Sequence, residues 1–213
     1  MAGRGMIVAI VGAESTGKTT LARGLTEALQ AQGLKAAMVP EFLREFCVDA
    51  NRTPYPHEQA AIAGEQTRRI TEAAKTADVV LADTTALMTA VYSEHLFADL
   101  SLYEQALSDQ AAAQLTLLTA LDLPWQADGL QRDGAHVREP VDHLLRQALM
   151  RAGLPFSVVA GQGEHRLAQA LLAVQQSMNA QQRAAQNASR PKWRWVCDKC
   201  DDGDCEQHWL PRA

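Results

Sequence analysis

The sequence is poor in aromatic residues, has no long apolar run and carries no excess of positive charge. Tryptophan, tyrosine and phenylalanine make up 5% of the 213 residues, so a packed core must come mainly from alanine, leucine, valine and isoleucine. The absence of any apolar run of about 18 residues excludes a membrane-spanning helix. The net charge of −5 argues against general affinity for nucleic acid or for an anionic membrane.

Cysteine is scarce and unevenly placed, with four residues in the whole chain. Cys47 is alone, whereas the other three crowd the C-terminus. The apolar run near the N-terminus continues directly into a glycine-rich motif, which argues against a removable signal peptide and predicts a cytoplasmic protein. In a reducing compartment, a cysteine cluster indicates a metal site more often than disulfides.

Apolar runs alternate with helical patterns along most of the chain. Strands are expected at 6–11, 34–39, 78–83, 115–121 and 155–161. Helical spacing covers about 18–31, 57–77, 102–115, 140–152 and 164–180. This alternation predicts right-handed βαβ units and a parallel sheet. The expected division is a domain over 1–178, a polar linker or helix tail over 179–192, and a Cys/His-rich module over 193–213.

Residues Gly12 to Thr19 fit the pattern of a phosphate-binding loop, GxxxxGK[ST], between an apolar strand and a helix. The glycines let the backbone curl so that several N–H groups point at one phosphate. Lys18 then reaches the β- and γ-phosphates, and the hydroxyl of Thr19 binds Mg²⁺. The ATP-binding set is predicted as Gly12, Ala13, Glu14, Ser15, Thr16, Gly17, Lys18, Thr19 and Thr20.

Asp83 ends the apolar run "VVLAD" and offers Mg²⁺ a second anchor, although a strand-end aspartate can also cap the following turn. Together with the phosphate loop, it predicts an α/β P-loop kinase fold. We expect a three-layer α/β/α sandwich around a five-stranded, mostly parallel sheet, followed by the Cys/His-rich extension.

Several longer segments resemble one family. "GAESTGKTTLARGL", "VPEFLREF", "VVLADTTALMTAVYSEHLF", "LDLPWQADGLQRDG" and "VVAGQGEHRLAQAL" occur in this order. Together they look like the nicotinamide riboside kinase domain of the bacterial NadR family, over about residues 6–175. The resemblance implies that ATP phosphorylates the 5′-hydroxyl of nicotinamide riboside to give nicotinamide mononucleotide. Some NadR proteins place an adenylyltransferase domain before the kinase, and we expect a kinase without it here.

The acceptor side is expected at the carboxyl ends of the strands, where parallel sheets bind ligands. Glu41 follows the second strand and is the candidate general base, or the acceptor that orients the attacking hydroxyl. Asp83 can share that role, and both are assigned to catalysis with Lys18. Arg44 either binds the substrate or pairs with a neighbouring glutamate. Loss of water from such a site protects ATP from hydrolysis.

The loop 122–139 is the candidate lid. The arginines of this loop, Arg132 first and Arg138 second, are expected to neutralise charge on the transferred phosphoryl group. Asp128 is expected to accept hydrogen bonds from ribose hydroxyls. Trp125 either stacks on a pyridinium ring or anchors the loop into the core. Tyr92, within "AVYSEHLF", is a second candidate for stacking, with burial in the core as its alternative.

The C-terminal cluster Cys197-x2-Cys200-x4-Cys205-x2-His208 offers four ligands of the type that Zn²⁺ binds. Residues 193–213 contain three Lys/Arg and five Asp/Glu, so contact with nucleic-acid phosphates is not expected. The alternatives are an acidic tail with free thiols, or disulfide or redox use. The NadR resemblance does not explain this extension.

Three functions remain open at this point. The first is phosphorylation of nicotinamide riboside, and the second is phosphorylation of another nucleoside or nucleotide by the same machinery. The third is a regulatory ATPase that signals through a zinc-binding C-terminal module. The acceptor-side residues favour the first two, and the Cys/His cluster favours the third. The expected partners are ATP and a small-molecule acceptor, without nucleic acid or membrane, and no feature specifies an oligomeric state.

Overall fold

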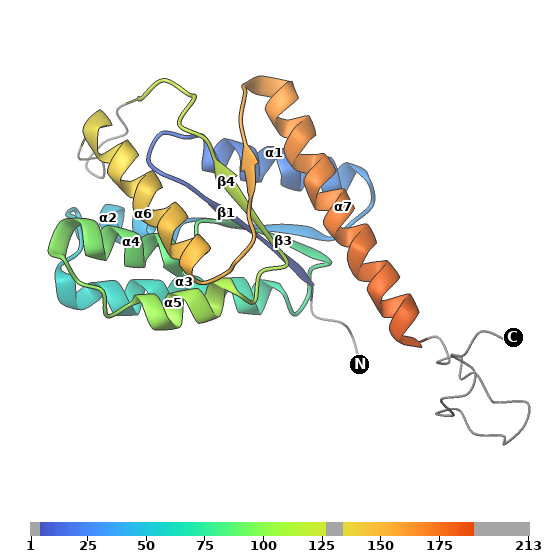
Figure 1. Cartoon of the computed structure of the whole chain (residues 1–213), viewed down its shortest axis with the longest axis horizontal. Helices are drawn as coiled ribbons and strands as arrows, with labels where there is room; N and C mark the ends of the chain where they lie inside the picture. Colours follow the sequence, from blue (N-terminus) through green and yellow to red (C-terminus); the bar gives the residue numbers. More distant parts are fainter. Residues whose placement is uncertain (1–4, 127–133, 190–213) are drawn as a thin grey trace, which may run out of the picture. The chain divides into compact units, whose positions relative to one another are not determined.

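The computed structural model describes residues 5–126 and 134–189. A five-stranded sheet lies between two layers of helices within these residues (Figure 1). Each pair of neighbouring strands is parallel. The predicted α/β fold with a five-stranded parallel sheet is confirmed.

All five strands lie where the apolar runs place them; β1 has the predicted bounds, and the other four are shorter than predicted. Their order across the sheet is β2-β3-β1-β4-β5. The bounds are β1 Met6–Val11, β2 Ala36–Val39, β3 Val79–Asp83, β4 Leu115–Thr119 and β5 Ser157–Val159. Because β1 is central and covered on both faces, all six of its residues are buried, which explains its unbroken apolar sequence.

Helices occupy the predicted segments, and the described residues also form α2 and α4, which lie outside those segments. Their bounds are α1 Lys18–Ala31, α2 Phe42–Ala50, α3 Gln59–Ala73, α4 Ala86–Phe97, α5 Tyr103–Gln110, α6 Arg138–Arg151 and α7 Gly163–Ser189, with 3₁₀ turns η1 Pro56–Glu58 and η3 Ala135–Val137. The expected loop 122–139 is too long at its end, because η3 and the first residues of α6 occupy 135–139. Helix α4 was not predicted, since its first six residues are all buried and show no amphipathic period.

The side chains of β1 alternate between two cores. Val8 and Ile10 pack with Leu25 of α1 and Val174 of α7. On the opposite face, Val11 packs with residues of α4 and α6, and Ile7 with residues of α3. Figure 1 accordingly shows α1 and α7 on one side of the sheet. The central strand is therefore fixed from both sides, and the loop that follows it starts from a rigid base.

The chain divides into two compact units, Met1–Met178 and Asn179–Ala213. The segment expected as a linker or helix tail continues α7 through residue 189. The Cys/His-rich module, with Cys197, Cys200, Cys205 and His208, lies outside the described residues. No helix in the described part of the chain is long and apolar enough to span a membrane.

Candidate functional site

The turn between β1 and α1 forms the phosphate loop, and its two outer glycines are required by its geometry. Gly12 has φ 151°, and a Cβ at this position would lie 2.0 Å from the hydroxyl oxygen of Thr119. Gly17 has φ 76° and precedes the first turn of α1. Ser15 also has a positive φ, 56°. Only glycine accepts the first two conformations without steric cost, as the motif predicts.

Side chains hold this loop from behind. The hydroxyl of Thr16 donates to the carbonyl oxygen of Ala13 at 2.8 Å, and its oxygen lies 2.7 Å from that of Thr119 at the end of β4. Lys18 Nζ donates to the same Ala13 carbonyl at 2.8 Å. Thr16 and Ala13 are fully buried. The loop is therefore shaped before any ligand arrives, which lowers the entropy lost on binding a phosphate.

Arg166 of α7 ties three loops together, and the sequence did not single it out. Its guanidinium donates to the carbonyl of Thr16 at 2.7 Å, to Asp122 Oδ1 at 3.0 Å and to the carbonyl of Gly161 at 3.0 Å. The N–H of Gly161 donates to the other oxygen of Asp122. Burial alone would raise the pKa of Asp122, but these two donors lower it overall. Asp122 thereby stays anionic and holds the base of the 122–126 segment.

Thr19 and Asp83 meet beside the phosphate loop, as predicted for a magnesium site. The register of β1 with β3 pairs Ile10 with Asp83, which brings the end of β3 next to the loop. The Thr19 hydroxyl donates to Asp83 Oδ2 at 2.6 Å. Asp83 is 2% exposed, and its Oδ1 is buried without a hydrogen-bond partner in the described part of the chain. Hydroxyl and carboxylate oxygens are ligands that Mg²⁺ accepts, so these residues fit it.

Two cavities adjoin the loop. The first, of about 570 Å³, is here termed the loop cavity and is lined by residues 15–20 together with Leu123, Pro124, Gln126 and Gln162. The second, of about 410 Å³, is termed the aromatic cavity, and its lining includes Tyr55, Gln59, Met88, Tyr92 and Phe97. Both cavities are lined by Ser15, Lys18, Glu41 and Arg44. The two spaces therefore share one wall at the lysine of the phosphate loop.

The predicted acceptor-side residues are distributed unequally around these cavities. Glu41 and Arg44 line both, and Arg44 Nε lies 3.7 Å from Glu41 Oε2, so the local ion pair considered from the sequence is present. Tyr92 lines the aromatic cavity. Trp125 lines neither cavity, and its indole N–H is buried without a partner among the described residues. Asp128 and Arg132 lie outside the described residues.

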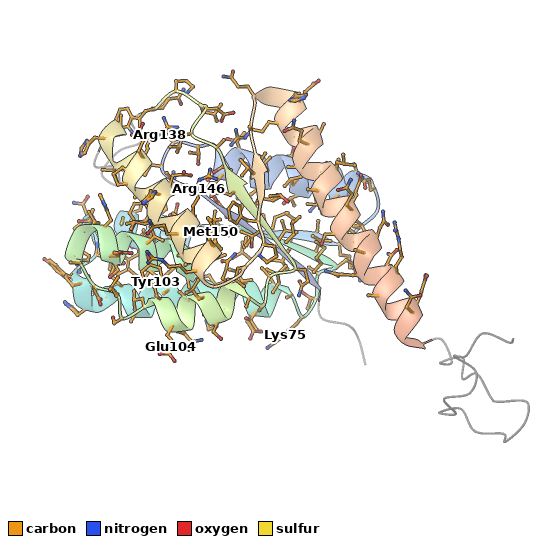
Figure 2. The ribbon with its side chains drawn as sticks, in the orientation of Figure 1. Lys75, Tyr103, Glu104, Arg138, Arg146 and Met150 are labelled. Atoms are coloured by element: carbon orange, nitrogen blue, oxygen red, sulfur yellow. The ribbon has the colours of Figure 1, made fainter. Side chains whose placement is uncertain are left out.

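Arg138, a weaker lid candidate, begins α6 (Figure 2). It is 8% exposed and lines neither cavity. Its Nε and Nη2 atoms have no hydrogen-bond partner within residues 5–126 and 134–189. Arg138 therefore does not contribute to the wall that the two cavities share.

A tight turn before α3 supplies residues that the sequence did not reveal. Arg52 Nη1 and Nη2 donate to the two oxygens of Glu58, each at 2.7 Å, and the backbone N–H of Tyr55 donates to Glu58 at 2.7 Å. Arg52 also lies over the Tyr55 ring, 4.1 Å from its centroid. The guanidinium first, and then the N–H, lower the pKa of Glu58 to about 2. The flanking prolines in "TPYPHEQ" were the available signal for an ordered turn.

Residues 7–166 match the family model described as AAA domain. The fold is similar to that of a NadR protein in complex with NR, with 21% identity, a TM-score of 0.64, and coverage of 82% of this chain and 51% of that chain. It is equally similar to a NadR protein in complex with NAD and AMP-PNP, with 20% identity, a TM-score of 0.64, and coverage of 83% and 50%. The chain thus spans about half the length of these NadR chains.

Thymidylate kinase from Ehrlichia chaffeensis also shares the fold, with 15% identity, a TM-score of 0.56, and coverage of 83% of this chain and all of that chain. No curated protein matches the sequence. The resemblance to the kinase domain of NadR is confirmed for the fold, which is that of P-loop kinases.

Proposed function

Because this chain belongs to the AAA domain family and has a P-loop kinase fold, we propose that it is an ATP-dependent kinase of nicotinamide riboside. The product of transfer to the 5′-hydroxyl is nicotinamide mononucleotide. One observation carries the proposal: two cavities share a wall made of Ser15, Lys18, Glu41 and Arg44. A simple ATPase needs only the loop cavity, whereas a kinase needs a second cavity for the acceptor at the terminal phosphate.

The residues of the shared wall suit phosphoryl transfer. The loop holds the triphosphate, and Lys18 lies where it can reach the β- and γ-phosphates. The acceptor oxygen attacks the γ-phosphorus as the bond to the β-phosphate oxygen breaks and ADP leaves. Glu41 accepts the hydroxyl proton, and Arg44 beside it offsets phosphoryl charge. When bound at Thr19 and Asp83, Mg²⁺ supplies further charge neutralisation to the phosphates.

The size and lining of the aromatic cavity suit an acceptor that carries a flat ring, either uncharged or cationic. Its volume of about 410 Å³ lies within the usual range for small-ligand sites. Tyr92 in its lining offers a ring face for a pyridinium, worth on the order of 1–2 kcal/mol when water is excluded. The NadR structure in complex with NR is the basis for choosing this riboside among ring-bearing acceptors.

The proposal is tested by measuring ADP release from ATP with and without nicotinamide riboside. We expect release to depend on the riboside, and nicotinamide mononucleotide to appear in equal amount. Lys18→Ala should abolish turnover, whereas replacement of the exposed Lys35, which lines neither cavity, should not. Equal ADP release with and without the riboside would contradict the proposed acceptor.

Stacking is tested separately. Tyr92→Ala should raise the KM for the riboside about tenfold and leave the KM for ATP unchanged, because Tyr92 lines the aromatic cavity and not the loop cavity. Trp125→Ala is the comparison, since Trp125 lines neither cavity. If Trp125→Ala raises the riboside KM selectively and Tyr92→Ala does not, then Trp125, and not Tyr92, is the residue that stacks on the ring.

Two alternatives have separate support. The similarity to thymidylate kinase favours another nucleoside or nucleotide as acceptor, and a panel of acceptors in the same assay distinguishes this case. A regulatory ATPase with a zinc-binding tail rests on the sequence of Cys197, Cys200, Cys205 and His208. Metal analysis of the reduced, purified protein tests it, and zinc well below one equivalent would contradict it.

A further inference from the structure

Gln59, the first residue of α3, is a buried polar side chain in the lining of the aromatic cavity. It is 3% exposed. Its Oε1 atom has no hydrogen-bond partner among the residues that the structure describes. A buried acceptor without a partner has lost its hydrogen bonds to water without compensation, and native proteins rarely retain one without a reason. The cavity beside Gln59 is the place from which a partner can come.

A second glutamine on the same helix shows how a purely structural glutamine behaves. Gln66 is 2% exposed and lines neither cavity. Its Oε1 accepts the N–H of Phe42 at 2.8 Å, and its Nε2 donates to the carbonyl of Thr84 at 3.3 Å. Gln66 is thus satisfied by the protein itself, whereas the Oε1 of Gln59 is not.

The turn that precedes Gln59 is fixed by contacts that do not involve the Gln59 side chain. The preceding turn is fixed by Glu58, which accepts from Arg52 and from the N–H of Tyr55. The same Arg52 lies over the ring of Tyr55, which also lines the aromatic cavity. The backbone fixed in this manner places Gln59 in the wall of the aromatic cavity before a ligand binds, so only the buried side chain has to be ordered on binding.

We propose that Gln59 determines specificity by accepting a hydrogen bond from a neutral N–H donor on the ring of the acceptor. The cavity then selects a ring carboxamide and rejects the matching ring carboxylate. The inference rests on the proposed function and adds to it the substituent that the site reads. A carboxylate has no proton to give to Oε1, and it would share the cavity with the carboxyl groups of Glu14 and Glu41.

The experiment compares nicotinamide riboside with nicotinic acid riboside, which differ in this substituent alone. Gln59→Met removes the amide at nearly constant volume, and Gln66→Met is the matched control. We expect Gln59→Met to lower kcat/KM for the amide riboside about tenfold and that for the acid riboside by less than about threefold. Gln66→Met should scale both values by the same factor.

Thermal unfolding gives a second readout that does not depend on turnover. Gln59→Met should leave the melting temperature unchanged or raise it, because the protein loses a buried acceptor that it does not satisfy. Gln66→Met should lower it, because the N–H of Phe42 and the carbonyl of Thr84 lose their partner. A drop in Gln59→Met as large as that in Gln66→Met would overturn the inference, since Gln59 would then be structural.

The two failures are distinguishable. If the wild-type protein phosphorylates the amide riboside but Gln59→Met lowers both kcat/KM values equally, the inference about Gln59 falls and the proposed function stands. If the wild-type protein phosphorylates neither riboside, the proposed function fails and the inference fails with it. A wild-type preference for the acid riboside overturns the inference directly.

Discussion

At the scale of single residues, Arg166 is the side chain on which most of the loop geometry depends. It donates to oxygens of Thr16, Asp122 and Gly161, which belong to three separate loops. Arg166→Lys keeps the charge but cannot reach three oxygens, so the carbonyl of Thr16 loses its partner. We expect kcat/KM for ATP to fall about tenfold or more. Steady-state kinetics with ATP as the varied substrate measures this.

The contact between Arg166 and Asp122 also predicts that substitutions of the two residues are not additive. Asp122→Asn removes the carboxylate to which Arg166 donates, so the double variant with Arg166→Lys should lose less than the sum of the two losses. The control is Arg146→Lys, because Arg146 pairs with Asp142 on α6 and lines neither cavity (Figure 2). Additive effects of Arg166→Lys and Asp122→Asn, or an equal effect from Arg146→Lys, would contradict a positioning role for Arg166.

The sequence predicted the role of a residue where that role depends only on neighbouring positions in the chain. Gly12, Gly17 and Lys18 serve one loop, and their spacing alone defines it. The role of Arg166 depends on a carbonyl 150 residues earlier in the chain, and no local pattern contains that information. Gln59 has the same difficulty, because its sequence neighbours do not reveal that it is buried beside a cavity.

At the scale of elements, the turn Tyr55–Glu58 predicts a pH dependence. The pKa of Glu58 is lowered from its ordinary value of 4.5 to about 2, first by Arg52 and then by the N–H of Tyr55. A lowered pKa means that its stabilising effect is fully present above pH 4.5 and is lost as the pH falls through about 2. Glu58→Gln should therefore melt at a lower temperature than the wild type near neutral pH. The gap should narrow between pH 4.5 and 2.

A control on another helix isolates this effect from general acid destabilisation. Glu104 is exposed on α5 and makes no ion pair within the described residues (Figure 2). Glu104→Gln should follow the wild-type melting temperature over the whole pH series. A gap between Glu58→Gln and the wild type that stays constant as the pH falls would show that the charge of Glu58 does not stabilise the turn.

Element-scale prediction succeeded for strands and was incomplete for helices. Strands β1 and β3 are buried on both faces, so their apolar runs mark them directly. Helix α4 has the same burial over most of its length, and so its sequence carries no helical period. The expected lid of 122–139 was too long because the polar residues before Pro140 resemble a loop, although Arg138 and Glu139 already belong to α6.

At the scale of the whole fold, the shared wall predicts that donor and acceptor are bound together. Strand order reverses around β1, and the loop, Asp83 and Glu41 all lie at the carboxyl ends of strands. A compound that joins the terminal phosphate of an adenosine polyphosphate to the 5′-oxygen of nicotinamide riboside would occupy both cavities. We expect it to bind on the order of 100-fold tighter than either part alone, because the second contact becomes intramolecular.

Calorimetric titration of the linked compound, with the adenosine polyphosphate and the riboside titrated separately, decides whether the cavities act as one site. Tyr92→Ala should remove the increase in affinity that the riboside part provides and leave the affinity for the adenosine polyphosphate unchanged. The reason is that Tyr92 lines the aromatic cavity and not the loop cavity. Lys18→Ala should weaken the linked compound and the polyphosphate together, since Lys18 lines both cavities. Equal affinity of the linked compound and the adenosine polyphosphate would mean that the aromatic cavity does not receive the acceptor. The second cavity would then need another occupant, and the case for a kinase over an ATPase would lose the observation that carries it.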